Sequence, residues 1–150
     1  MRNATMRIEY AGRRFVTDPY LAAKFSRPSY TGKSPNPLVE LPYPAEQVIE
    51  GAEMALISHL HSDHFDPAAQ ELLPKEMEII CQAGDEERLQ GMGFRQVRPV
   101  QESLDWRGIN IRRIPGQHGS GQVLKEMGDA SGFILQAANE PSVYWVGDTI

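Results

Sequence analysis

Apolar residues along this chain occur in short runs that glycine, proline and charged residues separate. In the segment MRIEY, residues 6–10, apolar and charged positions alternate, and this alternation predicts a half-exposed strand over residues 4–10. A second strand is expected over residues 13–17, after a hairpin turn at residues 11–12. Asp18-Pro19 ends this strand, and we interpret Asp18 as a turn former in preference to a group that orients a metal ligand.

After a long connection, the pattern predicts strands that alternate with helices. Asp66-Pro67 is typical of a helix start, with Asp66 as the N-cap and proline at the first helical position. We expect helices over residues 45–51, 66–73 and 84–91, and strands over residues 54–58, 77–81, 96–100, 102–106, 109–114, 132–137 and 143–146. This order favours an α+β fold with a mixed sheet that carries helices on one face, built as a single domain over residues 1–150.

The connection over residues 22–44 is rich in proline and serine, so we expect a long loop there without a regular element. Long ordered loops in compact domains often contribute to binding sites. Arg27, Tyr30 and Lys33 are therefore candidates to contact an anionic substrate group. A solvated surface loop is the alternative.

Composition narrows the possible functions. The net charge of −5 and pI near 5.4 give no general attraction to phosphate backbones, so nucleic acid is not an expected partner. A single cysteine, Cys81, excludes an internal disulfide and lies in an apolar run typical of a buried strand. No signal-peptide core or bilayer-spanning stretch is visible, so we expect a cytoplasmic protein with a small-molecule substrate and no membrane partner.

The strongest chemical signal is SHLHSDHFD, residues 58–66, which places His59, His61, Asp63 and His64 within six positions. Residues two apart in an extended chain point the same way, so His59 and His61 are expected to face one point. Asp63 and His64 follow in the turn before the next helix. Imidazole and carboxylate ligands suit zinc, and also manganese, iron or nickel, and such sites without thiolates are typical of catalytic metal centres. A single histidine at a strand end is often only hydrogen-bonded, but this density favours a metal site.

Two further residues are candidate ligands. His118 lies in the glycine-rich segment PGQHGSG, and Asp148 follows the last apolar strand. Glycine permits close backbone approach, so a ligand on such a loop is plausible. An exposed loop histidine and a turn aspartate are the alternative interpretations.

The segment His59-Leu60-His61-Ser62-Asp63-His64 resembles the H-x-H-x-D-H signature of the metallo-β-lactamase superfamily. The positions of His118 and of Gly147-Asp148-Thr149 are similar to those of later ligands in that family. The amino-terminal Thr17-Asp18-Pro19 resembles the branch that includes L-ascorbate-6-phosphate lactonase. The resemblance implies a metallo-β-lactamase-like αββα sandwich, of which this chain would cover the amino-terminal half and part of the second sheet.

The resemblance also implies roles for these residues. His59, His61 and His118 would hold one ion, Asp63 and His64 a second, and Asp148 would bridge them. The expected reaction is hydrolysis of an ester, lactone or phosphoester by a metal-activated water, with two zinc ions and with Asp63 as the catalytic group that orients the water or moves its proton.

The family commonly supplies another ligand histidine after the position of Asp148, and none follows here. We therefore expect an incomplete domain, with a homo-oligomer or a further chain segment to complete it, and weak occupancy of the second site. Three alternatives remain at this point: an HxH-type hydrolase on a TIM barrel, a nuclease or phosphodiesterase of the same superfamily, and a non-catalytic metal-binding module.

Overall fold

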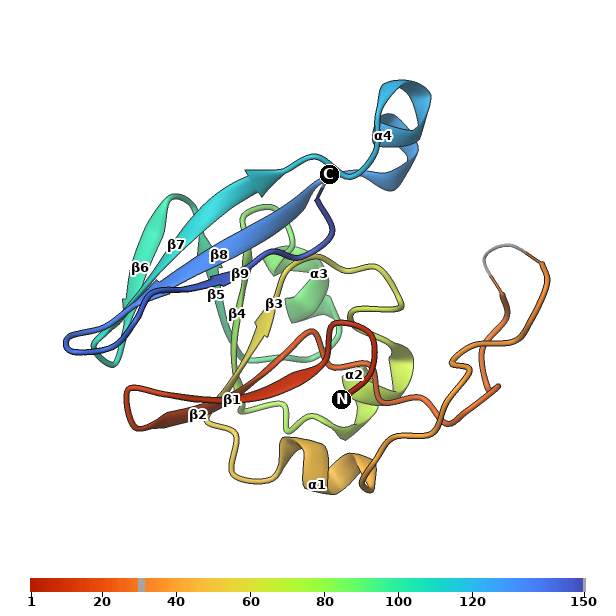
Figure 1. The fold of residues 1–150 in the computed structure, drawn as a ribbon, viewed down its shortest axis with the longest axis horizontal. Helices are drawn as coiled ribbons and strands as arrows, with labels where there is room; N and C mark the ends of the chain where they lie inside the picture. The colour runs from red at the N-terminus through yellow and green to blue at the C-terminus, as the bar shows by residue number, and fades with distance from the viewer. Residues whose placement is uncertain (30–31, 150) are drawn as a thin grey trace.

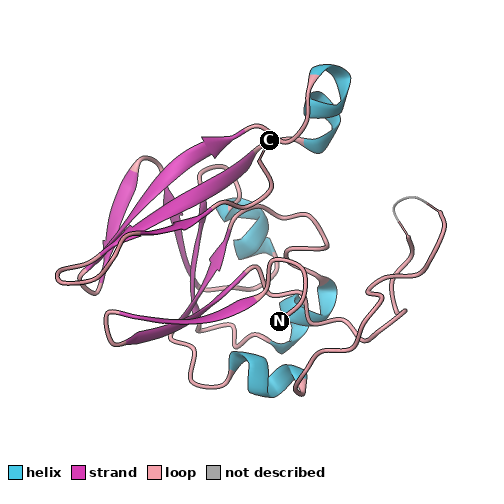
Figure 2. Cartoon of the chain, in the orientation of Figure 1, coloured by secondary structure: helices cyan, strands magenta, loops and turns pink. Residues whose placement is uncertain are grey.

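The computed structural model describes residues 1–29 and 32–149, which form two β-sheets and four helices (Figure 1, Figure 2). The first sheet has five strands in the order in which they occur along the chain. They are β1 (Met6–Tyr10), β2 (Arg13–Thr17), β3 (Met54–Ile57), β4 (Glu78–Gln82) and β5 (Gln96–Val100). The β1–β2 pair is the predicted antiparallel hairpin, and the strands from β2 to β5 run parallel. The parallel arrangement brings the carboxyl ends of β2, β3 and β4 to one edge.

The second sheet is antiparallel throughout and lies across the first (Figure 1). It consists of β6 (Ser103–Trp106), β7 (Ile109–Gly116), β8 (Ala130–Gln136) and β9 (Val143–Trp145). The antiparallel pairing of these strands places β9 beside the carboxyl ends of β2 and β3. The two sheets, with their parallel and antiparallel halves, exclude the TIM-barrel alternative.

Three of the helices occupy the predicted positions, namely α1 (Ala45–Ile49), α2 (Pro67–Leu72) and α3 (Glu86–Gly91). The carboxylate of Asp66 caps α2 by accepting a hydrogen bond of 2.9 Å from the backbone N–H of Ala69. The fourth helix, α4 (Gly121–Met127), was not predicted. It has no buried residue, so its sequence lacks the apolar periodicity by which a helix is recognised.

Two hydrophobic cores hold these layers together because β3 alternates its side chains between them. Ala55 and Ile57 pack with α1, α2 and α3 on one face of the first sheet. Met54 and Leu56 face the second sheet and pack with side chains that include Trp106 and Phe133. Every residue of β3 is buried, as expected of a central parallel strand covered on both faces. The result is an α/β/β layering, and the predicted fold class is confirmed.

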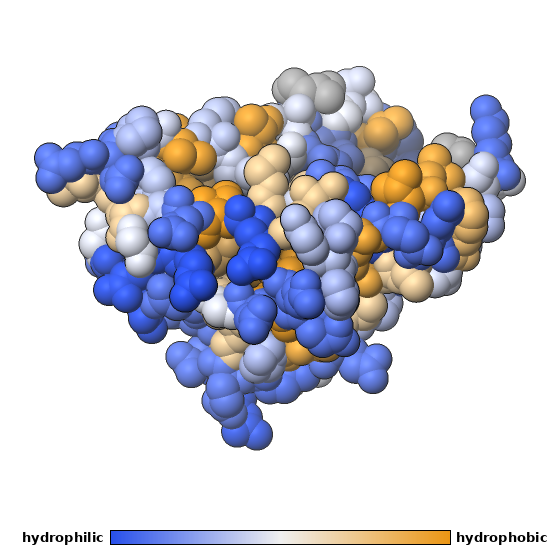
Figure 3. All heavy atoms as spheres, turned by 60° about the horizontal axis from the view of Figure 1, so that its bottom comes forward, coloured by the Kyte–Doolittle hydropathy of each residue, from blue (hydrophilic) through white to orange (hydrophobic). Residues whose placement is uncertain are grey.

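The described part of residues 22–44 contains no helix or strand, as the sequence predicted, and a backbone bridge joins Arg27 to Asn36. Tyr30, one of its candidate substrate contacts, lies outside the described residues. On the face that carries α1, hydrophilic side chains predominate and hydrophobic ones form separate patches (Figure 3). None of the helices within residues 1–29 and 32–149 has both the length and the apolar character needed to cross a membrane.

Candidate metal centre

The loop after β3 gathers three histidines by reversing direction within one turn. The backbone N–H groups of His64 and Phe65 both donate to the carbonyl of His61, at 3.0 and 2.8 Å. Phe65 is 1% exposed and anchors the turn in the core. This reversal brings the ring of His64 back over His59, with 4.1 Å between the ring centroids. The spacing in the sequence therefore places the rings of His61 and His64 against the buried His59.

Residues distant in sequence complete two overlapping groups of possible metal ligands. His59, His61 and His118 form one group, and His59, His64 and Asp148 form the other. Within each group, the ligand atoms all lie within 4.8 Å of one another. His118 comes from the loop between β7 and α4, and Asp148 from the segment after β9. The structure thus brings together five of the six residues that the sequence singled out.

The donor atoms of this centre suit a cation. The Nε2 atom of His59 is buried and has no hydrogen-bond partner in the described part of the chain, and the buried Nε2 of His118 makes no hydrogen bond but faces the carboxylate of Asp148. A buried polar atom without a partner carries a substantial desolvation penalty, which coordination of an ion would remove. Asp148 adds a carboxylate, with Oδ1 3.1 Å from Nε2 of His64 and Oδ2 3.3 Å from Nε2 of His118. Neutral imidazoles and a carboxylate are a ligand set for zinc and similar divalent metals.

A buried carboxylate behind the histidines fixes their orientation. Asp18 is 0% exposed and accepts hydrogen bonds from the backbone N–H and hydroxyl of Ser58, at 2.7 and 2.8 Å. Its Oδ2 also lies 3.0 Å from Nδ1 of His64 and accepts from the indole N–H of Trp145 at 3.1 Å. The preference for Asp18 as a turn former alone was therefore wrong. Its φ of 37° does end β2, but its side chain joins β2, β3 and β9 behind the site.

This network also assigns the free nitrogen of His59. The hydroxyl of Ser58 donates a hydrogen bond to Asp18. Its oxygen, 3.0 Å from Nδ1 of His59, therefore acts as an acceptor for that ring. Nδ1 of His59 then carries the ring proton, and Nε2 keeps the lone pair that faces the site. The role of Ser58 was not recognised from the sequence. Its position at the strand end, directly before the first histidine, was the available signal.

Electrostatics differ between the two histidines nearest the centre. Burial, reinforced by His64 and His61, lowers the pKa of His59 to about 3, so this ring is neutral and ready to coordinate. Burial also lowers the pKa of His64, but its hydrogen bonds with Asp148 and Asp18 outweigh this and raise the pKa to about 10. The hydrogen bond from His64 in turn holds the pKa of Asp148 down to about 2. In the metal-free protein, the proton of His64 thus faces the carboxylate at a place where a cation would bind.

Asp63 is placed differently from the other predicted ligands. It belongs to neither ligand group in the described part of the chain. It lines a separate cavity of about 270 Å³ together with Asn3, Tyr20 and residues 36–39. Its role as a ligand and catalytic group stays a prediction.

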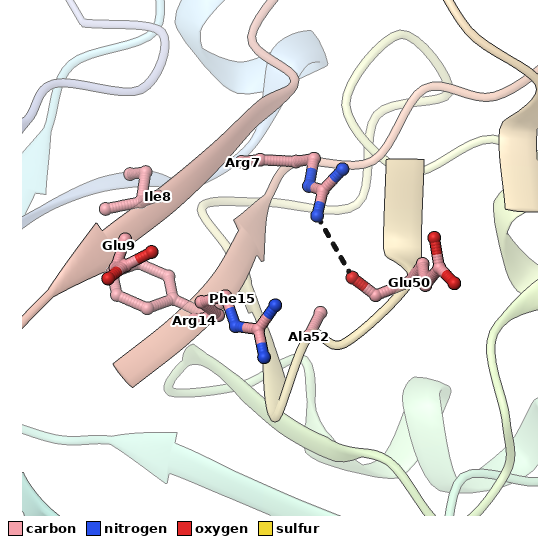
Figure 4. Close-up of a pocket in the computed structure, with 7 residues that line it drawn as sticks. All are labelled: Arg7, Ile8, Glu9, Arg14, Phe15, Glu50 and Ala52. Atoms are coloured by element: carbon pink, nitrogen blue, oxygen red, sulfur yellow. Dashed lines mark hydrogen bonds between the residues drawn. The ribbon is translucent and has the colours of Figure 1, made fainter. Parts of the chain in front are cut away.

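A surface groove lies at the β1–β2 hairpin, away from the candidate metal ligands (Figure 4). Arg7 and Arg14 lie along it, between the β1–β2 hairpin and the end of α1. The guanidinium of Arg7 is already used there, since it donates to the backbone carbonyls of Gln47 and Glu50 at 3.0 and 3.2 Å. Arg7 therefore joins α1 to the β1–β2 hairpin. The candidate metal ligands lie elsewhere, in the loop after β3 and in the segments after β7 and β9.

The family model described as the beta-lactamase superfamily domain matches residues 13–150. The chain belongs to this family. The β-lactamase superfamily domain of this chain is similar to UPF0173 protein YddR of Bacillus subtilis (strain 168), at 33% identity over the whole chain and 61% of that protein. The narrower lactonase-like branch stays a prediction.

Two solved structures resemble this superfamily domain closely. One is a possible metal-dependent hydrolase from Veillonella parvula DSM 2008, with a TM-score of 0.95 and 34% identity. The other is an isothiocyanate hydrolase from Delia radicum gut bacteria, with a TM-score of 0.92 and 34% identity. Each comparison covers 99% of this chain and 61% of the other. The chain therefore spans about three fifths of the length of these relatives.

Proposed function

We propose that this chain provides the metal centre of a metal-dependent hydrolase. The observation that carries the proposal is the pair of ligand groups that share His59, whose buried Nε2 has no hydrogen-bond partner among the described residues. The similarity to proteins named as metal-dependent hydrolases supports the same conclusion. A non-catalytic metal-binding module is the alternative, and the experiment below distinguishes the two.

Some residues of the centre would bind the metal ions, and others orient these ligands. His59, His61 and His118 would hold one ion, and His64 and Asp148 would share in a second, with zinc as the favoured metal and manganese, iron or nickel as alternatives. When bound, a divalent ion supplies Lewis acidity and makes water a nucleophile near neutral pH. Ser58 and Asp18 orient the rings of His59 and His64. Asp148 would supply the carboxylate ligand of the second group.

Several classes of substrate fit such a centre. An ester, lactone or phosphoester presents an electrophilic carbon or phosphorus to the centre. The similarity to an isothiocyanate hydrolase adds an isothiocyanate to these candidates. Asp63 would orient the water or move its proton, as the resemblance in its sequence implies.

The test combines metal analysis with hydrolysis of a panel containing an ester, a lactone, a phosphodiester and an isothiocyanate. We expect bound metal, and turnover of at least one compound that a chelator abolishes and added zinc restores. His118→Ala should lower metal content because it removes one of three ligands. Asp63→Ala should retain the ion at the histidine group while hydrolysis falls, since Asp63 is outside that group.

Three outcomes would contradict parts of this proposal. A protein that retains no metal would contradict the proposed metal centre. Full metal content without turnover of any compound would favour the binding module. Unchanged hydrolysis in Asp63→Ala would remove the catalytic role of that residue.

A further inference from the structure

A cavity of about 200 Å³ opens directly beside the metal centre, and His59 and His61 form part of its wall. The opposite wall comes from the end of β4 and the start of α3, with Gln82, Asp85 and Arg88. Residues 127–129, which connect α4 to β8, close it from the side of the second sheet. A substrate held at the centre would therefore place its non-reacting group in this space.

Hydrogen bonds fix the wall between β4 and β8. The amide nitrogen of Gln82 donates to Oδ2 of Asp85 and to the backbone carbonyl of Asp129, both at 3.0 Å. Its oxygen accepts from the hydroxyl of Ser131 at 2.8 Å, and that hydroxyl accepts from Nε of Arg113 at 2.7 Å. Gln82 is 4% exposed, and its amide is fully engaged by these partners. It shapes the wall, and the groups left to recognise a substrate are the charged ones.

The charges around the cavity are mainly negative. Asp85 and Asp129 line it, and Glu86 adjoins it by accepting from the backbone N–H of Gly84 at 2.7 Å. Arg88 is the cation in the lining, but its side chain is 64% exposed and its Nη1 lies 4.0 Å from Oδ1 of Asp85. Solvent screens such an exposed pair strongly. Burial raises the pKa of Asp85 and outweighs the lowering by its hydrogen bond from Gln82 and by Arg88, while Glu86 and Asp129 add smaller rises.

The cavity is connected to the reacting centre by His59. His59 lines the cavity and belongs to both ligand groups. An ion held by these groups would therefore lie close to the cavity and its carboxylates. A positive group would relieve the repulsion among the carboxylates, whereas a negative group would add to it.

We propose that this cavity receives the non-reacting group of the substrate, and that Asp85 and Asp129 make it select cationic or uncharged groups over anionic ones. The inference rests on the proposed hydrolase function. It points to substrates with an amine or a neutral chain on the side away from the reacting bond. Phosphorylated or carboxylated chains are disfavoured.

The test uses three esters of matched length on the metal-loaded protein. They are the p-nitrophenyl esters of 4-(aminomethyl)benzoic acid, 4-ethylbenzoic acid and 4-(carboxymethyl)benzoic acid, which place a positive, neutral or negative group at the same distance from the carbonyl on a ring that keeps the group from reacting with it. We expect kcat/KM to fall in that order, by about tenfold for each unit of charge, as expected for charges near a partly screened wall. A kcat/KM for the anionic ester equal to or higher than that for the neutral ester would overturn the proposal.

A second measurement separates the cavity from the reaction. The three corresponding hydroxamates chelate a metal ion without being hydrolysed, and calorimetry gives their affinities. The same order of affinities would support the cavity even if no ester is turned over, in which case only the hydrolase function fails. Equal affinities for all three would refute the charge selection, whatever the esters show.

Substitutions then test which residues cause the selection by charge. Asp129→Asn, at an exposed position, and Asp85→Asn should each narrow the ratio between the cationic and anionic probes by about threefold to tenfold. Arg88→Gln should widen it. Glu126→Gln removes a charge from α4 at a residue outside the lining, and its ratio should match that of the unmodified protein. A ratio that Asp129→Asn and Asp85→Asn leave unchanged, or that Arg88→Gln narrows, would contradict the assignment.

Discussion

The Nδ1 atom of His64 lies 3.0 Å from Oδ2 of Asp18, although 46 positions separate the two residues in the chain. The carboxylate of Asp18 is fully buried and also accepts from Ser58 and from Trp145. This contact points the other nitrogen of His64 toward Asp148 at 3.1 Å. The orientation of the centre therefore depends on a residue that does not itself belong to either ligand group.

Asp18→Asn should weaken metal binding while leaving the chain folded. The amide has a similar shape, but its NH₂ group must face a donor, either the backbone N–H of Ser58 or the donors around Oδ2. Loss of such an outer partner typically costs about 10–100-fold in metal affinity. Competition with a chromogenic chelator measures the affinity, and circular dichroism checks the fold. Glu140→Gln, an exposed acid in the β8–β9 turn, is the control, and an affinity equal to that control would show that Asp18 does not support the ligands.

Gly147→Ala should destabilise the protein and displace Asp148. Gly147 has φ of +65°, and a Cβ there would lie 2.6 Å from the carbonyl oxygen of Ser131 and 3.2 Å from Cβ of Ser58. The strained φ alone costs about 1–3 kcal/mol, and the backbone contact adds to it. Urea unfolding measures the loss. Gly91→Ala, in α3 with nothing within 4 Å of its added Cβ, should leave stability unchanged or raise it. Equal effects of both substitutions would contradict the close approach at Gly147.

Glu78→Ala should reduce stability at the other end of the sheets. The indole N–H of the fully buried Trp106 donates to Oε2 of Glu78 at 2.9 Å, a bond that joins β6 to β4. Its removal leaves a buried donor unpaired, at a cost of about 1–3 kcal/mol in the free energy of unfolding. Glu78→Gln keeps an acceptor and should cost less. Glu76→Ala removes only an exposed pair with Arg95 and should change stability by less than about 1 kcal/mol.

Cys81 should be unreactive in the folded protein and should make stability depend on alkaline pH. Burial raises the pKa of its thiol to about 12 from the usual 9.0. A raised folded-state pKa contributes stability that is fully present below the unfolded pKa, and this contribution is lost as pH rises between about 9 and 12. A thiol reagent at pH 8 should therefore modify Cys81 only after urea is added. Cys81→Ala should show a smaller fall in stability over that pH range, and rapid modification of the native protein would contradict the burial.

Local sequence was sufficient for every element except α4 and for half of the centre. The alternation in residues 6–10 gave the hairpin, and Asp66-Pro67 gave the start of α2. His59, His61 and His64 are neighbours because one turn joins them, so their clustering follows from short-range spacing. The helix α4 was missed because its exposed surface leaves no periodic apolar signal.

The sequence offered His118 and Asp148 only as candidates, and the tertiary structure brings them to the centre. His118 and Asp148 reach His59 because β7, β8 and β9 pair in a fixed register, which no local pattern specifies. The same packing buries Asp18 beneath the histidines, separates Asp63 from the ligand groups and places Asp85 beside the cavity. Spacing along the chain determines which side chains are available, whereas burial and long-range pairing determine which of them meet, because these depend on contacts between residues far apart in sequence.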